Sequence, residues 1–507
     1  SWQITVYEAD FETPDPIKGK VFYQIFPDRF CEGVENKPMP FPDRLYQADK
    51  HAEPFWQPNE VGGHLNEDYF GGDLKGIQIK LPYLREMGVD YLYLNPIFEA
   101  HSNHRYNTAD YLNVDPLLGT NEDFEALCTA AKKYGIGIVL DGVFSHTGSD
   151  SRYFNREGRY GEGGAYRDPN SPYRSWYDFD SKYKDGYRSW RGFETLPEVN
   201  EETPSYVEFI TGEGGVIDTW LRRGAAGFRL DVADELPDEF IEKVRTAVKR
   251  VGPDKFLLGE VWEDATTKFG FDKRRTYLLG KGLDSVMNYP FKNAVLGFVC
   301  GRDAGQTMTD ILSICEHYPA PALDTALNFL STHDTERALT VIADEPANGR
   351  GREWQSGRCV TGDAYEEGML KLRMAYAIIY TLPGVPCLYY GDEIGMQGYR
   401  DPFNRGFYCW DSHEERLKPV LAQLAQLRHT CEAFRTGKLR VLRAEGGVLH
   451  YQRIGEFEAA EIIVNRTEHI IVEPLASGKH TEVNPMGFTI VVEEVGHNPN
   501  HSYYDYK

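Results

Sequence analysis

The chain has 507 residues, more than one hydrophobic core usually supports, so we expect one large domain with smaller attachments. Its 55 Lys and Arg residues against 78 Asp and Glu residues give a formal net charge of -23. Such an acidic chain repels phosphate backbones and anionic lipid, which argues against nucleic acid and membrane partners.

Cysteine usage and the start of the chain bear on the compartment. The eight cysteines are dispersed, with no CxxC and no close pairing, so we expect reduced thiols. The start Ser1-Trp2-Gln3 lacks a basic segment followed by an apolar one, and no run approaches the ~18 apolar residues typical of a membrane span. We therefore expect a cytoplasmic protein, or a secreted one if a signal peptide was removed.

Short apolar runs rich in β-branched and aromatic residues alternate with helical patterns along most of the chain. Eight runs are predicted as strands: 21–26, 89–97, 136–144, 227–232, 256–261, 283–289, 326–330 and 385–390. Amphipathic stretches such as 74–87 and 121–134 separate successive runs, which favours a parallel sheet. Eight strand and helix units that close on themselves give an α/β fold of the (β/α)8 TIM barrel type.

Two intervals depart from this alternation. Residues 147–205 are rich in Tyr, Arg, Gly and Asp and lack long apolar periodicity, so we predict an inserted excursion domain, domain B, after the third strand. Residues 434–507 contain alternating runs such as 448–453, 460–464 and 488–492, which predict a C-terminal antiparallel β-sandwich domain. The barrel then comprises residues 21–146 and 206–433, and residues 1–20 form an N-terminal arm.

Polar residues cluster where predicted strands end. They are Asp141 and His146 after the third strand, Arg229 and Asp231 on the fourth, Glu260 on the fifth, and His333 and Asp334 after the seventh. The carboxyl ends of barrel strands form the active face. A single buried Asp or His is more often a hydrogen-bonded core residue than a catalyst, but agreement among four strand ends predicts a site.

Two of these carboxyl groups suit opposite protonation states. Arg229 and Asp231 are two residues apart on one strand, so they share a face, and the guanidinium would keep Asp231 ionised. Glu260 ends a separate strand, where a partly apolar setting near Trp262 would favour its protonated form. One ionised and one protonated carboxyl group are the layout of a glycosidase pair. The 13% aromatic content suits sugar binding, although aromatic residues also fill cores.

Four ordered segments resemble the motifs of the α-amylase family, and the resemblance covers nearly the whole chain. They are Asp141-Gly-Val-Phe-Ser-His146, Gly227-Phe-Arg-Leu-Asp231, Gly259-Glu260-Val-Trp262 and Ser331-Thr-His333-Asp334. Leu196-Pro-Glu-Val-Asn200 and Val232-Ala-Asp-Glu235 are similar to signatures of neopullulanases, cyclomaltodextrinases and maltogenic amylases. The resemblance implies a retaining hydrolase of α-1,4-glucosidic bonds in starch, maltooligosaccharides, cyclodextrins or pullulan, with some capacity for α-1,6 bonds.

The resemblance also implies residue roles. Asp231 is the nucleophile, Glu260 the general acid/base, and Asp334 the carboxylate that stabilises the distorted sugar. The implied substrate-binding residues are Asp141 and Arg229 beside this trio, His146, His333 and Tyr106 at the cleaved sugar, Asp234, Glu235 and Trp262 on the acceptor side, and Asp401 and Arg405 at the next sugar outward. Tyr106 could instead be core packing, and Asp401 with Arg405 a surface ion pair. No HxH or HExxH spacing supports a catalytic zinc.

Calcium sites of the family are depleted in this sequence. Ser145 stands where many members have an asparagine ligand, and Glu235 replaces the matching histidine of the second motif. The subfamily's alternative site, after the first strand, is reduced to Cys31-Glu-Gly-Val-Glu-Asn36, although Gly71-Gly-Asp73 persists. Hard cations need several oxygen ligands, so we expect no metal and no cofactor, calcium included.

Assembly and reaction type remain open at this stage. Subfamily members usually carry an additional N-terminal β domain that caps a neighbouring subunit's cleft, whereas residues 1–20 precede the first predicted strand here. We therefore expect a monomer or weak oligomer with an open cleft. A transferase with the same carboxyl groups and a non-catalytic glucan-binding relative are the alternatives. The latter is disfavoured because Asp231, Glu260 and Asp334 are all retained.

Overall fold

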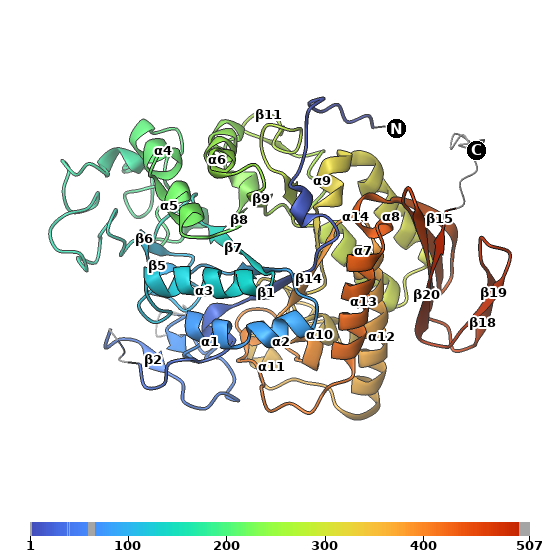
Figure 1. The fold of residues 1–507 in the computed structure, drawn as a ribbon. Coiled ribbons are helices and arrows are strands. Elements are labelled where there is room, and N and C mark those ends of the chain that lie inside the picture. The colour runs from blue at the N-terminus through green and yellow to red at the C-terminus, as the bar shows by residue number, and fades with distance from the viewer. Residues whose placement is uncertain (1–2, 38, 40, 59–65, 496–507) are drawn as a thin grey trace.

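The computed structural model describes residues 3–37, 39, 41–58 and 66–495. Its centre is an eight-stranded parallel sheet in the order β12-β9-β8-β7-β4-β1-β14-β13 (Figure 1). The strands are β1 Phe22–Ile25, β4 Tyr91–Leu94, β7 Gly137–Gly142, β8 Gly227–Leu230, β9 Phe256–Gly259, β12 Ser285–Val286, β13 Leu327–Phe329 and β14 Val385–Tyr389. A parallel bridge between Met287 and Leu327 joins the two ends of the sheet. The predicted TIM barrel is confirmed, with each strand inside its predicted run.

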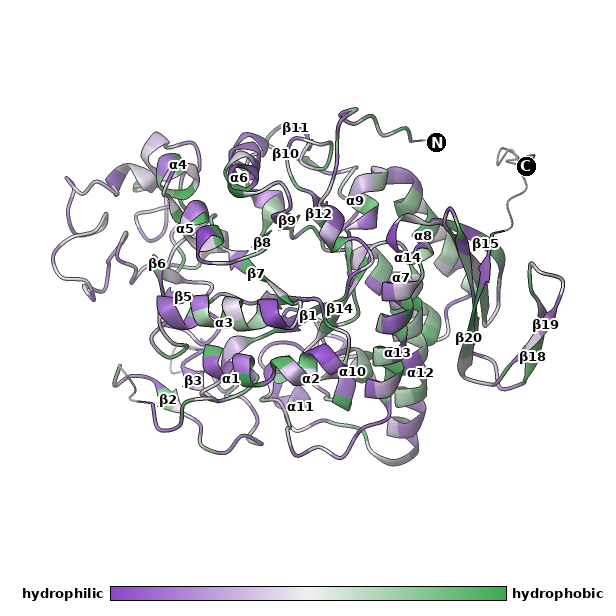
Figure 2. Cartoon of the chain, viewed as in Figure 1, coloured by the Kyte–Doolittle hydropathy of each residue, from purple (hydrophilic) through white to green (hydrophobic). Residues whose placement is uncertain are grey.

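Helices surround this sheet, and the longer ones pack on it through an apolar stripe. In α6, the buried Phe240, Ile241, Val244 and Val248 recur at helical spacing and face the strands. The helices are α1 Leu74–Ile79, α2 Leu81–Glu86, α3 Asn121–Lys133, α4 Pro204–Thr211, α5 Val216–Arg222, α6 Asp238–Val251, α7 Tyr289–Val299, α8 Ala304–His317, α9 Ala320–Asp324, α10 Ala338–Ala343, α11 Arg352–Gln355, α12 Gly362–Thr381, α13 Leu417–Thr430 and α14 Ala433–Thr436. Hydrophobic residues concentrate on the strands and the inner helix faces (Figure 2).

Local chemistry decides where several helices begin or end. The predicted amphipathic stretch 121–134 is α3, whose start is fixed by a capping box between Thr120 and Asp123. The predicted stretch 74–87 is divided into α1 and α2, because Pro82 near the start of α2 has no N–H to donate. Between β9 and β12 the chain forms a short hairpin, β10 Phe269–Gly270 and β11 Lys273–Arg274, in place of a helix.

The irregular segment predicted over 147–205 leaves the barrel after β7. Its regular elements are short 3-10 helices, η3 Arg174–Trp176 and η4 Trp190–Gly192, and isolated bridges such as Tyr177 to Val199. Aromatic side chains build its interior, with Tyr153, Phe154 and Trp176 all buried. The segment shows no helical or strand periodicity because its backbone forms mostly turns and short 3-10 helices.

After α14 the chain forms an antiparallel sheet, β15 Lys438–Glu445, β16 Val448–Ile454, β17 Glu458–Asn465 and β20 Gly487–Glu494, in the order β15-β16-β17-β20. A two-stranded ribbon, β18 Ile471–Pro474 and β19 His480–Val483, packs on it through Ile463, Leu475 and Val483. The predicted C-terminal antiparallel β region is confirmed, its bounds stay a prediction, and residues 496–507 of that prediction lie outside the described residues. The sheet and the excursion lie on opposite sides of the barrel (Figure 1).

Smaller elements complete the chain. They are the 3-10 helices η1 Asp15–Ile17, η2 Pro27–Arg29, η5 Ala233–Glu235, η6 Asp392–Ile394 and η7 Phe403–Arg405, and the strands β2 Leu45–Tyr46, β3 Asp68–Tyr69, β5 Phe98–Ala100 and β6 Thr108–Val114. All eight cysteines are unpaired, as the dispersed spacing predicts. Of the helices formed by the described residues, none combines the length and apolar character that crossing a bilayer requires. Residues 1–2 of the predicted N-terminal arm lie outside the described residues.

Candidate active site

Arg229 lies at the centre of the predicted site and contacts three of its carboxyl groups. Its Nη1 is 2.9 Å from Asp141 Oδ1 and 2.9 Å from Asp231 Oδ1, and its Nη2 is 2.9 Å from Glu260 Oε2. Parallel pairing of β7, β8 and β9 places the ends of these strands side by side. Residues from three strands therefore meet at one edge of the barrel, as the strand-end pattern predicts.

Burial dominates the electrostatics of this cluster. The Arg229 side chain is fully buried. Burial raises the pKa of Asp231 well above its ordinary range, because desolvation and the nearby Glu260, Asp141 and Asp334 outweigh the attraction of Arg229. Burial likewise raises the pKa of Asp141. The expectation that Arg229 alone keeps Asp231 ionised is too simple, because one guanidinium is shared among several carboxyl groups. Burial and mutual repulsion therefore favour the protonated forms of Asp231 and Asp141.

Glu260 is held by donors that the sequence argument did not assign. Its Oε2 accepts the backbone N–H of Val232 at 2.8 Å, and its Oε1 accepts the Nε1–H of Trp262 at 2.8 Å. Val232 adopts a left-handed conformation with φ of 41°, which is rare for a β-branched residue and costs roughly 1–3 kcal/mol. This strained turn directs the Val232 N–H at Glu260. Trp262 supplies a hydrogen-bond donor as well as the expected apolar surface.

Trp262 also presents a platform beside Glu260. Its ring stacks on Tyr289 with centroids 4.1 Å apart and planes 15° apart, while 44% of the residue remains exposed. One face is thus supported by protein and the other is open. An exposed aromatic face next to a carboxyl group is a suitable surface for a sugar ring.

Tyr106 and His333 form one hydrogen-bonded unit with Asp141. Tyr106 Oη donates to Asp141 Oδ2 at 2.6 Å and lies 2.8 Å from His333 Nε2. The Tyr106 and His333 rings stack with centroids 5.3 Å apart. Gln24 Nε2 donates to His333 Nδ1 at 2.9 Å, so the proton of the neutral ring resides on Nε2. Burial lowers the pKa of His333 well below its usual value, which keeps the ring neutral.

Both ring nitrogens of His146 already have protein partners. Its Nε2 lies 3.1 Å from the Tyr106 carbonyl oxygen and its Nδ1 lies 2.8 Å from Ser145 Oγ. Burial lowers the pKa of His146 to about 4. The ring therefore helps to position Tyr106, and its predicted hydrogen bond to a sugar requires one of these contacts to open.

The residues predicted for the outer sugar adjoin Asp334. Arg405 Nη1 is 3.0 Å from Asp401 Oδ1, and its Nη2 is 3.6 Å from Asp334 Oδ1. Asp334 Oδ2 also lies 3.1 Å from His333 Nε2. The Asp334 side chain is 34% exposed whereas that of Arg405 is 8% exposed, so the carboxyl group is accessible and its cationic neighbour is fixed. The Asp401–Arg405 ion pair therefore lies beside Asp334, and its role at the outer sugar stays a prediction.

The predicted acceptor residues are tied to other elements. Glu235 Oε2 accepts the Nε1–H of Trp190, a residue of the excursion, at 2.6 Å. Asp234 accepts from Tyr277 Oη at 2.6 Å and pairs with Lys268 Nζ at 2.7 Å. The Trp190 ring also packs on His146, with centroids 5.4 Å apart. Trp190 therefore joins the excursion to both sides of the site.

Several supporting residues were missed by the sequence argument. They are Gln24, Tyr93 and Asn95 inside the barrel, Trp190 in the excursion, and Tyr289 beneath Trp262. Tyr93 and Asn95 are two residues apart near the end of β4, and this alternation of polar side chains was an available signal. Trp190 offered no comparable pattern, since its partner Glu235 lies 45 residues away in the sequence.

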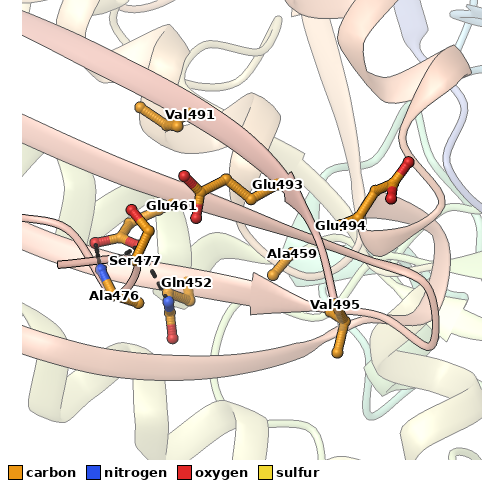
Figure 3. Close-up of a pocket in the computed structure, with 9 residues that line it drawn as sticks. All are labelled: Gln452, Ala459, Glu461, Ala476, Ser477, Val491, Glu493, Glu494 and Val495. Carbon is orange, nitrogen blue, oxygen red and sulfur yellow. Dashed lines mark hydrogen bonds between the residues drawn. The ribbon is translucent and has the colours of Figure 1, made fainter. Parts of the chain in front are cut away.

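The residues at the family's first calcium position are engaged elsewhere. Ser145 Oγ contacts His146, and the Glu235 carboxylate contacts Trp190 and Arg191. No group of three or more His, Cys, Asp or Glu side chains in the described part of the chain has a metal-binding arrangement. A separate hollow on the C-terminal sheet (Figure 3), lined by Gln452, Glu461 and Glu493 among others, includes none of the predicted site residues.

Comparisons with known proteins place the chain in a family. The family described as "Alpha amylase, catalytic domain" matches residues 24–433. An amylopullulanase of Thermoanaerobacterium saccharolyticum is 35% identical over 88% of this chain and 37% of its own length. A cyclomaltodextrinase of Geobacillus thermopakistaniensis is 32% identical over 92% of this chain and 72% of its own. Ligand-free cyclic α-maltosyl-(1→6)-maltose hydrolase from Arthrobacter globiformis has a TM-score of 0.79, with 30% identity over 95% of this chain and 100% of that one.

The extent of these matches differs between relatives. The chain spans between 25% and 37% of the length of the three amylopullulanases, but about three quarters of the cyclomaltodextrinase. The match to the family covers the barrel and the excursion, including each of the four motifs. The chain belongs to the α-amylase family, and it is similar to cyclomaltodextrinase and maltogenic amylase members of that family.

Proposed function

We propose that the chain hydrolyses α-1,4-glucosidic bonds with retention of anomeric configuration. The observation that carries this proposal is the guanidinium of Arg229, which contacts both Asp231 and Glu260. Two carboxyl groups that contact one guanidinium lie close together. This proximity is required if one of them attacks a glycosidic bond while the other protonates it. A non-catalytic role would not require these two carboxyl groups to converge.

In the proposed reaction, Asp231 attacks the anomeric carbon and Glu260 donates its proton to the departing glycosidic oxygen. This step forms a glucosyl ester on Asp231 and releases the remaining sugar chain. Glu260, now ionised, takes a proton from water, and the resulting hydroxyl group replaces Asp231 at the anomeric carbon. Asp334, held near Arg405, stabilises the distorted, positively charged sugar.

The substrates proposed are starch, maltooligosaccharides, cyclodextrins and pullulan. Relatives named cyclomaltodextrinase, neopullulanase and amylopullulanase support this set. Capacity for α-1,6 bonds is part of the same proposal, because the structural relative is named for hydrolysis of a sugar with a (1→6) linkage. Exposed Trp262 and the Asp401–Arg405 pair provide binding groups on the two sides of the cleaved bond.

Thin-layer chromatography of products from starch, pullulan and a cyclodextrin, run side by side, tests the substrate class. Proton NMR of the first product formed tests the mechanism: we expect the α-anomer before mutarotation. Initial release of the β-anomer would mean inversion and would refute the covalent role of Asp231. Absence of products from all three glucans would refute the proposed activity.

A second candidate is transfer of the glucosyl group to another sugar. The open face of Trp262 favours it, because a stacked sugar there lies beside Glu260 and can compete with water. Incubation with maltotriose separates the two outcomes. Products longer than maltotriose indicate transfer, and glucose with maltose alone indicates hydrolysis.

The cytoplasm is the proposed compartment, since eight unpaired cysteines suit a reducing environment. Fractionation of native cells with an antibody against the chain tests this. Recovery in the culture medium would contradict it.

A further inference from the structure

The side chain of Lys37 ends in a cage of oxygen atoms beside the barrel. Its Nζ lies 2.6 Å from the Gly71 carbonyl oxygen, 2.7 Å from Asp73 Oδ2 and 3.1 Å from the Leu117 carbonyl oxygen. An ammonium group has three N–H donors and no acceptor, so these three oxygens satisfy it. The side chains of Lys37 and Asp73 are only 12% and 2% exposed.

The cage is held together by contacts that do not involve Lys37. Asp73 Oδ1 accepts the N–H groups of Gly33 at 3.0 Å and Gly76 at 2.6 Å, and its Oδ2 accepts that of Val34 at 3.0 Å. A β-carbon on Gly76 would lie 1.8 Å from the Cys31 carbonyl oxygen. The loop after β1 is therefore packed closely on the start of α1, which fixes the oxygen positions.

The donor set is one that hard cations use. Backbone carbonyl and carboxylate oxygens are the ligands of calcium, and the resemblance to the subfamily implies an alternative calcium site in this region. A metal ion does not fit the cage as it stands, because the ammonium of Lys37 already contacts its oxygens and would repel a second cation. Lys50 adds a further ammonium 2.9 Å from Glu32 on the same loop.

We infer that Lys37 is a built-in cation that replaces a metal ion, and that removing its side chain uncovers a latent calcium site. The ammonium neutralises buried Asp73 and ties the loop after β1 to residues 71–73 and 117. This loop also carries Arg29, whose Nη1 donates to the Arg405 carbonyl oxygen at 2.9 Å. The internal cation thus supports the segment that holds Arg405 beside Asp334.

The test compares the melting temperature of the full chain in excess EDTA and in millimolar calcium for several variants. Lys37→Ala removes the charge and opens space, whereas Lys37→Met removes the charge but fills the space. Lys75→Ala is the matched control. Lys75 is exposed on α1, and its substitution changes the net charge by the same amount. Isothermal titration with calcium chloride measures binding directly.

For the wild type and Lys75→Ala we expect the same Tm in both buffers and no calcium binding. Lys37→Ala should lose roughly 5 °C or more in EDTA, and calcium should restore at least half of this loss. Lys37→Met should lose as much without recovery, because no space is open for an ion. If Lys37→Ala folds only when calcium is present, that result also supports the inference.

Three results would overturn the inference. The first is calcium binding or a calcium-dependent Tm in the wild type. The second is a Tm for Lys37→Ala in EDTA equal to that of the wild type. The third is a destabilised Lys37→Ala that calcium neither binds nor stabilises. If no Lys37 variant folds in either buffer, the titration of the wild type decides, and calcium binding there refutes the replacement.

Discussion

Replacing Arg229 with methionine tests whether a shared cation organises the active site. The substitution preserves an apolar stem of similar length but removes the guanidinium that contacts Asp141, Asp231 and Glu260 at 2.9 Å each. All of these side chains are at least 89% buried, so water cannot replace the lost charge. Removing one partner of a buried ion pair typically costs 3–5 kcal/mol, roughly the loss expected at neutral pH.

The pH dependence of this loss follows from the direction of the pKa shifts. The pKa values of Asp141 and Asp231 are already raised in the folded wild type, so their contribution to stability falls as pH rises toward those folded values. Without Arg229 these pKa values rise further and the folded variant retains an additional proton. Each additional proton increases the loss by about 1.4 kcal/mol per pH unit. Between about pH 5 and pH 7 the gap should widen by up to roughly 2.7 kcal/mol.

Urea unfolding of the wild type and Arg229→Met at pH 5 and pH 7 measures this gap. Arg435→Met is the matched control, because Arg435 forms an exposed pair with Asp15 whose loss should cost below about 1 kcal/mol at both pH values. Arg229→Lys keeps a charge without the planar fork and should fall between the wild type and Arg229→Met. A destabilisation by Arg229→Met that is equal at the two pH values would refute the reasoning.

Three further predictions concern single contacts. Asp231→Asn and Glu260→Gln should each lower kcat by several powers of ten while thermal unfolding stays cooperative; retention of more than a tenth of the activity would rule out the role assigned. In the folded protein the pKa of His146 is about 4, below its ordinary 6.5. The neutral ring therefore contributes its full stability above pH 6.5, and this stability is lost as the pH falls from 6.5 toward 4. Between pH 7 and pH 4, the free energy of unfolding measured in urea should fall by about 3 kcal/mol less for His146→Asn than for the wild type. Equal decreases would contradict the lowered pKa of His146. Trp190→Phe keeps a ring over His146 but loses the hydrogen bond to Glu235. The kcat/KM on maltotriose should therefore fall about tenfold, mainly because KM rises. An unchanged KM would exclude a role for Trp190 in substrate binding.

The local sequence was sufficient for the barrel and for the location of the candidate reactive groups. Strand runs such as 227–232 and 256–261 are short, apolar and followed by helical or turn patterns, and these signals depend on near neighbours in the chain. Asp231 and Glu260 lie just beyond the carboxyl ends of their strands, so the fold alone places them at one edge. The domain B prediction rested on an absence of periodicity, which follows from the scarcity of regular helices and strands in that segment.

Contacts between distant segments were decided by the tertiary structure. Arg229 is shared among carboxyl groups from three strands, Trp190 reaches Glu235 from the excursion, and Lys37 reaches Leu117 across 80 residues. Sequence spacing predicts which side chains share one strand or helix face, but a partner on another element depends on how those elements pack. Residue types and their order determined the fold and the candidate reaction. Burial and long-range pairing determined the pKa shifts of the site, because desolvation of a side chain occurs only once the chain is folded.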